Sequence, residues 1–497
     1  MRTFFEFFWS YLRSGLAATV VLAVAAGLVS AWVTPRGPVT TTQALATMVA
    51  ATLIGVIAGL FSASRWSMLV TPIVFLITFE FSRRGIEGPT VDAIHLGSTY
   101  GLIAFFVGRL FHGVISLVPM ILGARYGVSI AAWLGNQAAR AMNLAGWIFT
   151  SLVSVVLIIL AIYLARPAST PPIIGSDGEP VPGGIAELIS VPIGGHQQAM
   201  MIRGRNVENP VLLYLAGGPG GTDLGAMRAD VGLEQHFVVV TWEQRGAGKS
   251  YSALNPVETL TLNQMVSDTI EVTNYLRDRF DQEKIYLVGN SWGTILGTLV
   301  IQQRPDLYHA YVGTGQMVSP RETDIMFYQD TLTWAEENGN NKLASVLRQN
   351  GPPPYENLLD YEPAISHEHD WNPYPYLDTS KEMPGNLFVP ENNLMDRING
   401  LRGFLDTFSI LYPQLQQIDL RQDAPILQIP VTIVIGRYEA RGRAVLAEDW
   451  FELLEAPFKE LIVFDRSGHR PIFEEPVAFV EVMKKLLEDH PQDAAYQ

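Results

Sequence analysis

Long apolar segments with very few charged residues occupy the first third of the chain. Five can be distinguished, at residues 16–33, 44–61, 66–81, 100–122 and 144–164. A helix needs roughly 20 mostly apolar residues to cross a bilayer, so the pattern predicts about five membrane spans within residues 1–164. The third segment is the shortest, because Trp66 and Glu80 limit it. Buried helices of a soluble protein are the alternative interpretation.

Two ionisable residues lie within the fourth apolar segment. Arg109 and His112 are three positions apart and would share one face of a helix. Ionisable side chains at membrane depth are costly and often functional. In the alternative interpretation the segment forms two shorter pieces, with a possible break at Pro119 and Arg109 reaching an interface.

The arginines that flank the apolar segments give a weak indication of orientation. With five spans and a cytoplasmic N-terminus, the arginines facing the cytoplasm are Arg2, Arg13, Arg65, Arg125 and Arg140, and those facing outward are Arg36, Arg83, Arg84 and Arg166. This small bias predicts that the C-terminal domain lies outside the cytoplasm. One span more or fewer would reverse the prediction. We expect an integral protein of a prokaryotic plasma membrane.

Beyond residue 184 the pattern changes to short apolar runs that alternate with helical stretches. Residues 165–184, rich in Pro, Gly and Ser, are typical of a linker between the two patterns. The runs predicted as strands are residues 211–216, 237–242, 285–289, 310–313, 431–436 and 461–464. Their alternation with helices predicts an α/β domain with a mostly parallel sheet covered on both faces.

The alternation stops between residues 315 and 423. This stretch is rich in Pro and Asn, and it holds 17 acidic residues against seven basic ones. We therefore expect a mainly helical cap, inserted into a core formed by residues 185–314 and 424–497.

Charge and composition exclude several classes of function. Residues 1–170 carry ten Arg, no Lys and four acids, so their formal charge is +6. Because the formal charge of the whole chain is −15, the remaining residues carry −21. So acidic a domain argues against a nucleic-acid partner, because neutralising phosphates requires Lys and Arg. The chain has no cysteine, which excludes disulfides, thiolate zinc sites and cysteine nucleophiles.

The strongest chemical signal is the segment IYLVGNSWGTILG at residues 285–297. It places G-x-S-x-G between a predicted strand and a predicted helix, where flanking glycines permit the strained turn that raises a serine hydroxyl above a sheet edge. We predict that Ser291 is a nucleophile rather than part of an ordinary tight turn.

A serine nucleophile needs a base and an acid that orients the base, and in this architecture the chain order is Ser, acid, His. His469 follows the last predicted strand and is the candidate base. Glu439 follows the strand at 431–436 and is the candidate acid, because catalytic groups collect at the carboxyl ends of parallel strands. The competing acids are Glu448, Asp449 and Asp465.

An oxyanion formed during acyl transfer needs backbone N–H groups directed at it. Trp292 follows the nucleophile and is expected to supply one of them. The glycine loop that follows an earlier strand, Gly217-Gly218-Pro219-Gly220-Gly221, is expected to supply the other. Glycines let the backbone approach a substrate closely. No metal or organic cofactor is expected.

The segment EQRGAGKS at residues 243–250 ends like a phosphate-binding loop. Such a loop would need glycine where this chain has Glu243, so we do not expect a nucleotide partner. Arg245 and Gly246 are instead predicted to shape the turn beside Ser291, and Lys249 is predicted to be solvated.

Together these motifs resemble the α/β-hydrolase fold and, within it, the prolyl iminopeptidase (proline aminopeptidase) family of serine peptidases. That family carries an HGGPG-type loop, a DQRGxGxS loop, a GxSWG elbow, a GRYD acid site and an SGH base site. This chain has, in the same order, AGGPGG, EQRGAGKS, GNSWG, GRYE and SGH, within roughly residues 185–489. It departs from the pattern at Ala216, Glu243 and Glu439, where the family has His, Asp and Asp.

The resemblance implies a serine hydrolase that releases N-terminal residues from short peptides through an acyl-enzyme, and the apolar segments predict that it is anchored in a membrane. By this resemblance Ser291, Glu439 and His469 would form the triad, and Gly218 and Trp292 would form the oxyanion hole. Family members hold the substrate's α-amino group with cap carboxylates, for which Glu336 and Glu337 are the candidates here, although a solvated helix face is the alternative for each.

Two rival functions stay open at this point. One is an esterase or lipase that takes acyl substrates from the bilayer. The other is a membrane transport or sensing protein with a regulatory hydrolase-like domain. The oligomeric state is not predicted.

Overall fold

The computed structural model describes residues 15–134, 144–378 and 385–489. The chain divides into two compact units. The first consists of Met1–Pro167 with Asn393–Met395, and the second of Ala168–Asn392 with Asp396–Gln497.

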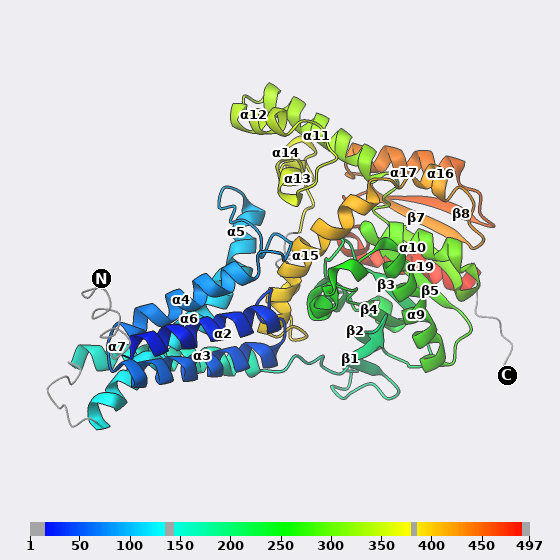
Figure 1. Ribbon diagram of the computed structural model, residues 1–497. Coiled ribbons are helices and arrows are strands. Elements are labelled where there is room, and N and C mark those ends of the chain that lie inside the picture. Colours follow the sequence, from blue (N-terminus) through cyan, green and yellow to red (C-terminus); the bar gives the residue numbers. More distant parts are fainter. Residues whose placement is uncertain (1–14, 135–143, 379–384, 490–497) are drawn as a thin grey trace. The chain divides into compact units, whose positions relative to one another are not determined.

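The first unit is helical. Its elements are α2 (Leu16–Val33), α3 (Thr41–Ser62), α4 (Ser67–Ser82), α5 (Thr99–Phe105), the π-helical η1 (Phe106–Leu110), α6 (Phe111–Leu134) and α7 (Leu144–Ala165) (Figure 1). Within the described residues, four helices are long and apolar enough to cross a membrane, namely α2, α3, the continuous helix Thr99–Leu134 and α7. The third predicted segment forms α4, which has only 16 residues. Three arginines of the orientation argument, Arg2, Arg13 and Arg140, lie outside the described residues.

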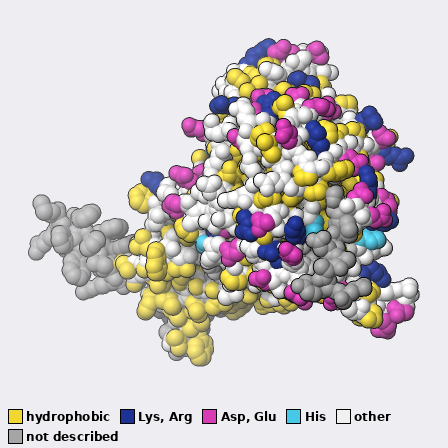
Figure 2. All heavy atoms as spheres, turned by 90° about the vertical axis from the view of Figure 1, so that its right-hand side faces the viewer, with side chains coloured by type: hydrophobic (Ala, Val, Ile, Leu, Met, Phe, Trp, Pro, Cys, Tyr) yellow, Lys and Arg dark blue, Asp and Glu magenta, His cyan; other side chains and the backbone are white. Residues whose placement is uncertain are grey.

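Large apolar side chains are exposed along these helices, among them Leu53, Ile77 and Ile159. One region of the surface in Figure 2 consists almost wholly of hydrophobic side chains, whereas acidic and basic side chains are interspersed elsewhere. A lipid environment would cover such a surface.

Glycines bring α3 and α6 into backbone contact. Each helix carries a pair of glycines four residues apart: Gly55 and Gly59 on α3, and Gly123 and Gly127 on α6. A Cβ at position 55 would lie 2.1 Å from the carbonyl oxygen of Met120, and one at position 127 would lie 2.1 Å from that of Val56. Small residues at this spacing allow close packing where burial from water does not drive helix association.

The fourth apolar segment is one continuous helical stretch that runs through Pro119, so the predicted alternative of two separate pieces is wrong. Arg109 lies in its π-helical turn. The Arg109 guanidinium donates to the carbonyl of Val91 at 2.7 Å and lies 3.4 Å from a carboxylate oxygen of Glu80. His112 is buried, with its ring centroid 4.6 Å from that of Phe79.

The second unit is built on an eight-stranded sheet with the order β1-β2-β4-β3-β5-β6-β7-β8. Its strands are β1 (Ile185–Ile193), β2 (His196–Gly204), β3 (Val211–Leu215), β4 (Val238–Trp242), β5 (Ile285–Asn290), β6 (Tyr308–Thr314), β7 (Val431–Gly436) and β8 (Lys459–Phe464). The β1–β2 and β2–β4 pairs are antiparallel and the other pairs are parallel. The mostly parallel sheet is confirmed, and β1 and β2 are additions to the predicted strands.

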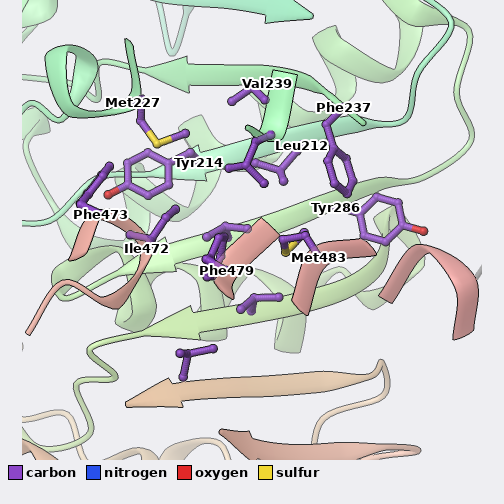
Figure 3. Packing of buried hydrophobic residues seen from close by; sticks show 14 of the residues in the cluster. Leu212, Tyr214, Met227, Phe237, Val239, Tyr286, Ile472, Phe473, Phe479 and Met483 are labelled. Carbon is purple, nitrogen blue, oxygen red and sulfur yellow. The ribbon is translucent and has the colours of Figure 1, made fainter. Parts of the chain in front are cut away.

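The direction of each crossover decides which face a helix covers. The connection from β3 to β4 runs one way along the sheet, and those from β4 to β5 and from β5 to β6 run the other way. Because crossovers between parallel strands are right-handed, α8 (Leu224–Ala229) lies on one face, and α9 (Leu262–Phe280) and α10 (Trp292–Gln303) on the opposite one. The C-terminal α19 (Pro476–Asp489) joins α8, since its Phe479 and Met483 pack with Leu212 and Tyr214 of β3 (Figure 3).

A helical insertion separates β6 from β7. It comprises α11 (Pro320–Glu337), α12 (Asn341–Asn350), α13 (Leu358–Ile365), α14 (Glu368–Trp371), η8 (Gly385–Leu387), α15 (Leu394–Leu415) and α16 (Leu420–Asp423). After β7 the chain continues through α17 (Arg441–Leu453), β8 and α18 (Pro471–Glu474). The predicted α/β fold with a mainly helical insertion is thus confirmed.

Candidate active site

The predicted site residues follow the carboxyl ends of neighbouring strands. The glycine loop follows β3, the EQRG loop follows β4, Ser291 follows β5, Glu439 follows β7 and His469 follows β8. Because these strands are parallel and adjacent, all five segments emerge at one edge of the sheet. Open α/β sheets bind their ligands at this edge.

Ser291 occupies a strained turn between β5 and α10. Its φ of 53° lies in the left-handed region, which costs a residue other than glycine on the order of 1–3 kcal/mol. Glycine is required on both sides of the turn, since a Cβ at Gly289 would lie 2.5 Å from the Gly293 carbonyl oxygen and one at Gly293 would lie 2.1 Å from that of Leu215. The local sequence therefore produces the turn that presents a serine hydroxyl at a sheet edge.

Glu439 and His469 form a direct pair. The His469 Nδ1 atom lies 2.7 Å from Glu439 Oε2, in the geometry of an acid that orients an imidazole. The Glu439 side chain is 1% exposed and that of His469 is 24% exposed, so the acid is buried while the base reaches the surface of the site.

The other carboxylate oxygen of Glu439 is also occupied. Oε1 accepts hydrogen bonds from the Ala440 N–H at 2.8 Å and from Arg443 Nε at 2.7 Å. Burial alone would raise the pKa of Glu439, but the charges of Arg443 and His469 and their hydrogen bonds outweigh burial and lower the pKa to about 2. Glu439 is therefore a carboxylate throughout the neutral range.

Two contacts connect Ser291 with the loop that carries His469. The Ser291 N–H donates to the Thr314 carbonyl at 3.1 Å. Gly315 follows directly, and a Cβ there would lie 2.3 Å from the His469 carbonyl oxygen and 3.0 Å from its ring. The ends of β5 and β6 thus bring the serine and the imidazole into the same neighbourhood.

The glycine loop lies beside the serine. A Cβ at Gly217 would be 3.3 Å from the Ser291 Cβ, so the backbone passes close to the hydroxyl. The Gly217 N–H donates to Asp223 at 3.3 Å, and Asp223 also accepts from Tyr214 at 2.8 Å and from Arg470 at 2.6 Å. This buried carboxylate holds the loop against the chain that carries His469.

Gln244 joins the two segments that are predicted to form the oxyanion hole. Its side-chain amide donates to the carbonyl of Ala216 at 3.2 Å, and its Oε1 accepts from the indole of Trp292 at 2.9 Å. Gly218 and Trp292 therefore belong to loops fixed to each other through one side chain.

The remaining residues of the EQRG loop form the scaffold. Arg245 is buried and pairs with Asp268 of α9 at 2.8 Å. Glu243 accepts from the N–H of Lys249 at 2.8 Å, and burial raises the pKa of Glu243. The prediction that Lys249 is solvated is wrong, because its ammonium pairs with Asp396 of the cap and only 13% of its side chain is exposed.

Cap helix α15 packs directly on the two glycine-containing loops. A Cβ at Gly220 would lie 2.3 Å from the carbonyl oxygen of Gly403, and one at Gly246 would lie 2.3 Å from the hydroxyl of Thr407. Thr407 also donates to the Gly246 carbonyl at 2.9 Å. Both glycines have positive φ, so backbone conformation and packing each require glycine there. Gly246 shapes its turn against the cap.

The other predicted acids are exposed, unlike the buried Glu439. Glu336 and Glu337 are exposed at the C-terminal end of α11, where Glu336 pairs with Arg348 of α12 at 2.7 Å. Neither has the desolvated surroundings expected of an amine-binding carboxylate. The competing triad acids Glu448, Asp449 and Asp465 are also exposed.

Sequence reasoning missed three residues that support this site. Gln244 belongs to the segment EQRGAGKS, so this motif could have indicated it. Asp223 and Arg443 bond to residues of the predicted site. Arg443 lies four residues after Glu439, a spacing that joins side chains on a helix, but its second partner is 75 residues distant in sequence.

Comparisons with known proteins agree with this architecture. The α/β hydrolase fold family matches residues 210–476. The chain is 32% identical over 319 residues to the probable aminopeptidase YbaC of Bacillus subtilis (strain 168), a match that covers 62% of this chain and 98% of the relative.

Two further relatives have related names. The probable proline iminopeptidase of Leptolyngbya boryana is 29% identical over 280 residues, covering 53% of this chain and 82% of the relative. The proline iminopeptidase of Saccharolobus solfataricus is 23% identical over 292 residues, covering 56% and 86%. More than a third of this chain lies outside each of the three matches.

Proposed function

The chain belongs to the α/β-hydrolase fold family, and from this premise we propose that it is a membrane-anchored serine aminopeptidase. It releases N-terminal residues from short peptides through an acyl-enzyme. The observation that carries the proposal is the 2.7 Å pair between His469 Nδ1 and the buried Glu439 carboxylate, at the same sheet edge as the strained Ser291. The names of the relatives support the choice of peptide substrates.

The proposed reaction uses the triad in two steps. His469 Nε2 takes the proton of the Ser291 hydroxyl as Oγ attacks the carbonyl carbon of the first peptide bond. Collapse of the tetrahedral intermediate breaks the C–N bond, and His469 gives its proton to the departing amine. Water then attacks the ester with His469 again as the base, which releases the amino acid and restores Ser291.

The other residues stabilise charge during these steps. The N–H groups of Gly218 and Trp292 hold the oxyanion of each tetrahedral intermediate. Glu439 keeps the proton of His469 on Nδ1 and stabilises the imidazolium. Its low pKa supports this role, because the acid stays ionised while the imidazole is charged.

We also propose that the first unit anchors the enzyme in a prokaryotic plasma membrane. The four apolar helices support anchoring. If α4 crosses as well, five spans place the catalytic unit on the side opposite the N-terminus, which the arginine distribution assigns to the outside.

A substrate panel on the purified full chain tests the proposed activity. We expect prolyl and other aminoacyl amides with a free α-amino group to be hydrolysed faster than their N-acetylated forms and faster than short or long acyl esters. Ser291→Ala should lower kcat by on the order of 10³-fold or more, with exposed Glu448→Gln as the matched control. Turnover of esters alone would replace the peptidase proposal with the esterase alternative.

A further inference from the structure

Arg443 contacts two carboxylates at once, the buried Glu439 and the partly buried Glu368. Its Nε donates to Glu439 Oε1 at 2.7 Å, and its Nη2 pairs with Glu368. The exposed fractions of the three side chains are 10% for Arg443, 1% for Glu439 and 15% for Glu368. Removing one partner from such a buried group leaves an uncompensated charge, which is costly.

The cap fixes the position of this guanidinium. Glu368 belongs to α14, and the ring of Phe327 on α11 lies 4.7 Å from the Arg443 guanidinium carbon, a cation–π distance. The same two helices do not hold Arg441 in this way, since its side chain is 52% exposed and its one ion pair among the described residues is with Asp330 on α11. Arg441 is therefore a matched control on the same helix.

We propose that Arg443 is a positioning residue for the hydrolytic reaction, and that Glu368 and Phe327 of the cap hold it in place. The inference rests on the proposed function. With Oε1 of Glu439 bound by Arg443 and the Ala440 N–H, the side chain has one remaining oxygen, Oε2, which faces His469. The cap thereby contributes to the orientation of the catalytic base through Arg443 and Glu439.

The arrangement also predicts an effect on pH dependence. The guanidinium and the imidazolium compete for the charge of one carboxylate, so removing Arg443 should stabilise the imidazolium and move the acid limb of the kcat/KM profile to higher pH. The titratable groups of neighbouring elements are Glu368 on α14, which pairs with Arg443, Glu474 on α18, which accepts from the Gly468 N–H, and Asp324 on α11, which interacts with Arg443. Burial raises the pKa of Asp324 to about 7, so the comparison of the acid limbs includes Asp324→Asn as a control.

The test compares Arg443→Met, Arg443→Lys and Arg441→Met in the full chain with an aminoacyl amide substrate. For Arg443→Met we expect kcat to fall about 10- to 100-fold, the effect of losing one or two charge-assisted hydrogen bonds. KM should be nearly unchanged, and the acid limb of the kcat/KM profile should lie at higher pH. Arg443→Lys should restore the acid limb but only part of kcat, because an ammonium cannot reproduce the guanidinium fork. Arg441→Met should match the wild type.

Three results would overturn the inference. The first is a wild-type kcat and an unmoved acid limb in Arg443→Met. The second, decisive if Arg443→Met does not fold, is a wild-type kcat in the double variant Glu368→Ala/Phe327→Leu, which removes both cap contacts of Arg443 while keeping its bond to Glu439. The third is an equal loss in Arg441→Met. If the wild type itself lacks Ser291-dependent hydrolysis, the proposed function fails and this inference falls with it.

Discussion

Glu439 illustrates how one side chain meets several demands at the residue scale. The family that the chain resembles has Asp at this position, whereas Glu439 uses its longer side chain to contact Arg443 and the Ala440 N–H with one oxygen and His469 with the other. A shorter acid placed on the same backbone cannot make both sets of contacts without a shift.

This geometry predicts a graded response at position 439. Glu439→Asp should lower kcat roughly 10- to 100-fold, through loss of one set of charge-assisted hydrogen bonds. Glu439→Gln should lower kcat by on the order of 10⁴-fold, because an amide fails to hold the correct tautomer of His469. Steady-state kinetics on an aminoacyl amide measures both effects.

Asp465 provides the control for this series. It is exposed and pairs with Arg437, so Asp465→Asn should keep wild-type kcat. An equal loss in Asp465→Asn, or full activity in Glu439→Gln, would contradict the assignment of the acid.

Short motifs could predict Ser291, Glu439 and His469 because each one is identified by its immediate neighbours. Supporting residues depend on distant partners, since Gln244 and Trp292 are 48 positions apart and Glu368 and Arg443 are 75 apart. A single sequence contains no sign of such pairs. The same reason applies to Lys249, whose partner in the cap is 147 positions away.

At the element scale, strands read as continuous apolar runs could be predicted, and strands whose sequence mixes polar and apolar residues could not. Every residue of β3, β4 and β7 is buried, so each is a continuous apolar run. β1 is mostly half-exposed, and β2 begins with polar residues. The sequence therefore did not indicate the two strands of this antiparallel pair. The cap was predicted to be mainly helical, but the bounds of its helices were not predicted, because its Pro- and Asn-rich sequence obscures them.

The glycines between α3 and α6 lead to a prediction of their own. Gly123→Leu should lower the Tm of the purified protein by roughly 5 °C or more, because a side chain at position 123 would overlap the Thr52 carbonyl oxygen, 2.1 Å from a Cβ. Thermal unfolding in detergent measures the change.

Gly113 is the matched control on the same helix. A Cβ there would meet only Leu117, at 3.8 Å, and leucine is the better helix former. Gly113→Leu should therefore leave Tm unchanged or raise it. A lower Tm for Gly113→Leu than for Gly123→Leu would contradict the proposed packing.

At the scale of the whole molecule, the chain joins an apolar helical unit to an acidic α/β unit. The contrast in charge between the two parts predicted this division from sequence. The segment between α7 and β1 contains no helix, and its Thr170 bonds to Glu391 and Arg203 of the second unit.

The most direct test of the central claim is covalent labelling with a serine-directed fluorophosphonate. The account predicts that the folded full chain is labelled at one site, identified as Ser291 by mass spectrometry of its peptides. Ser291→Ala should abolish labelling, and Glu439→Gln should slow it strongly. Absence of label at Ser291 in folded protein, or undiminished labelling of Ser291→Ala, would contradict the assignment of this chain as a serine hydrolase.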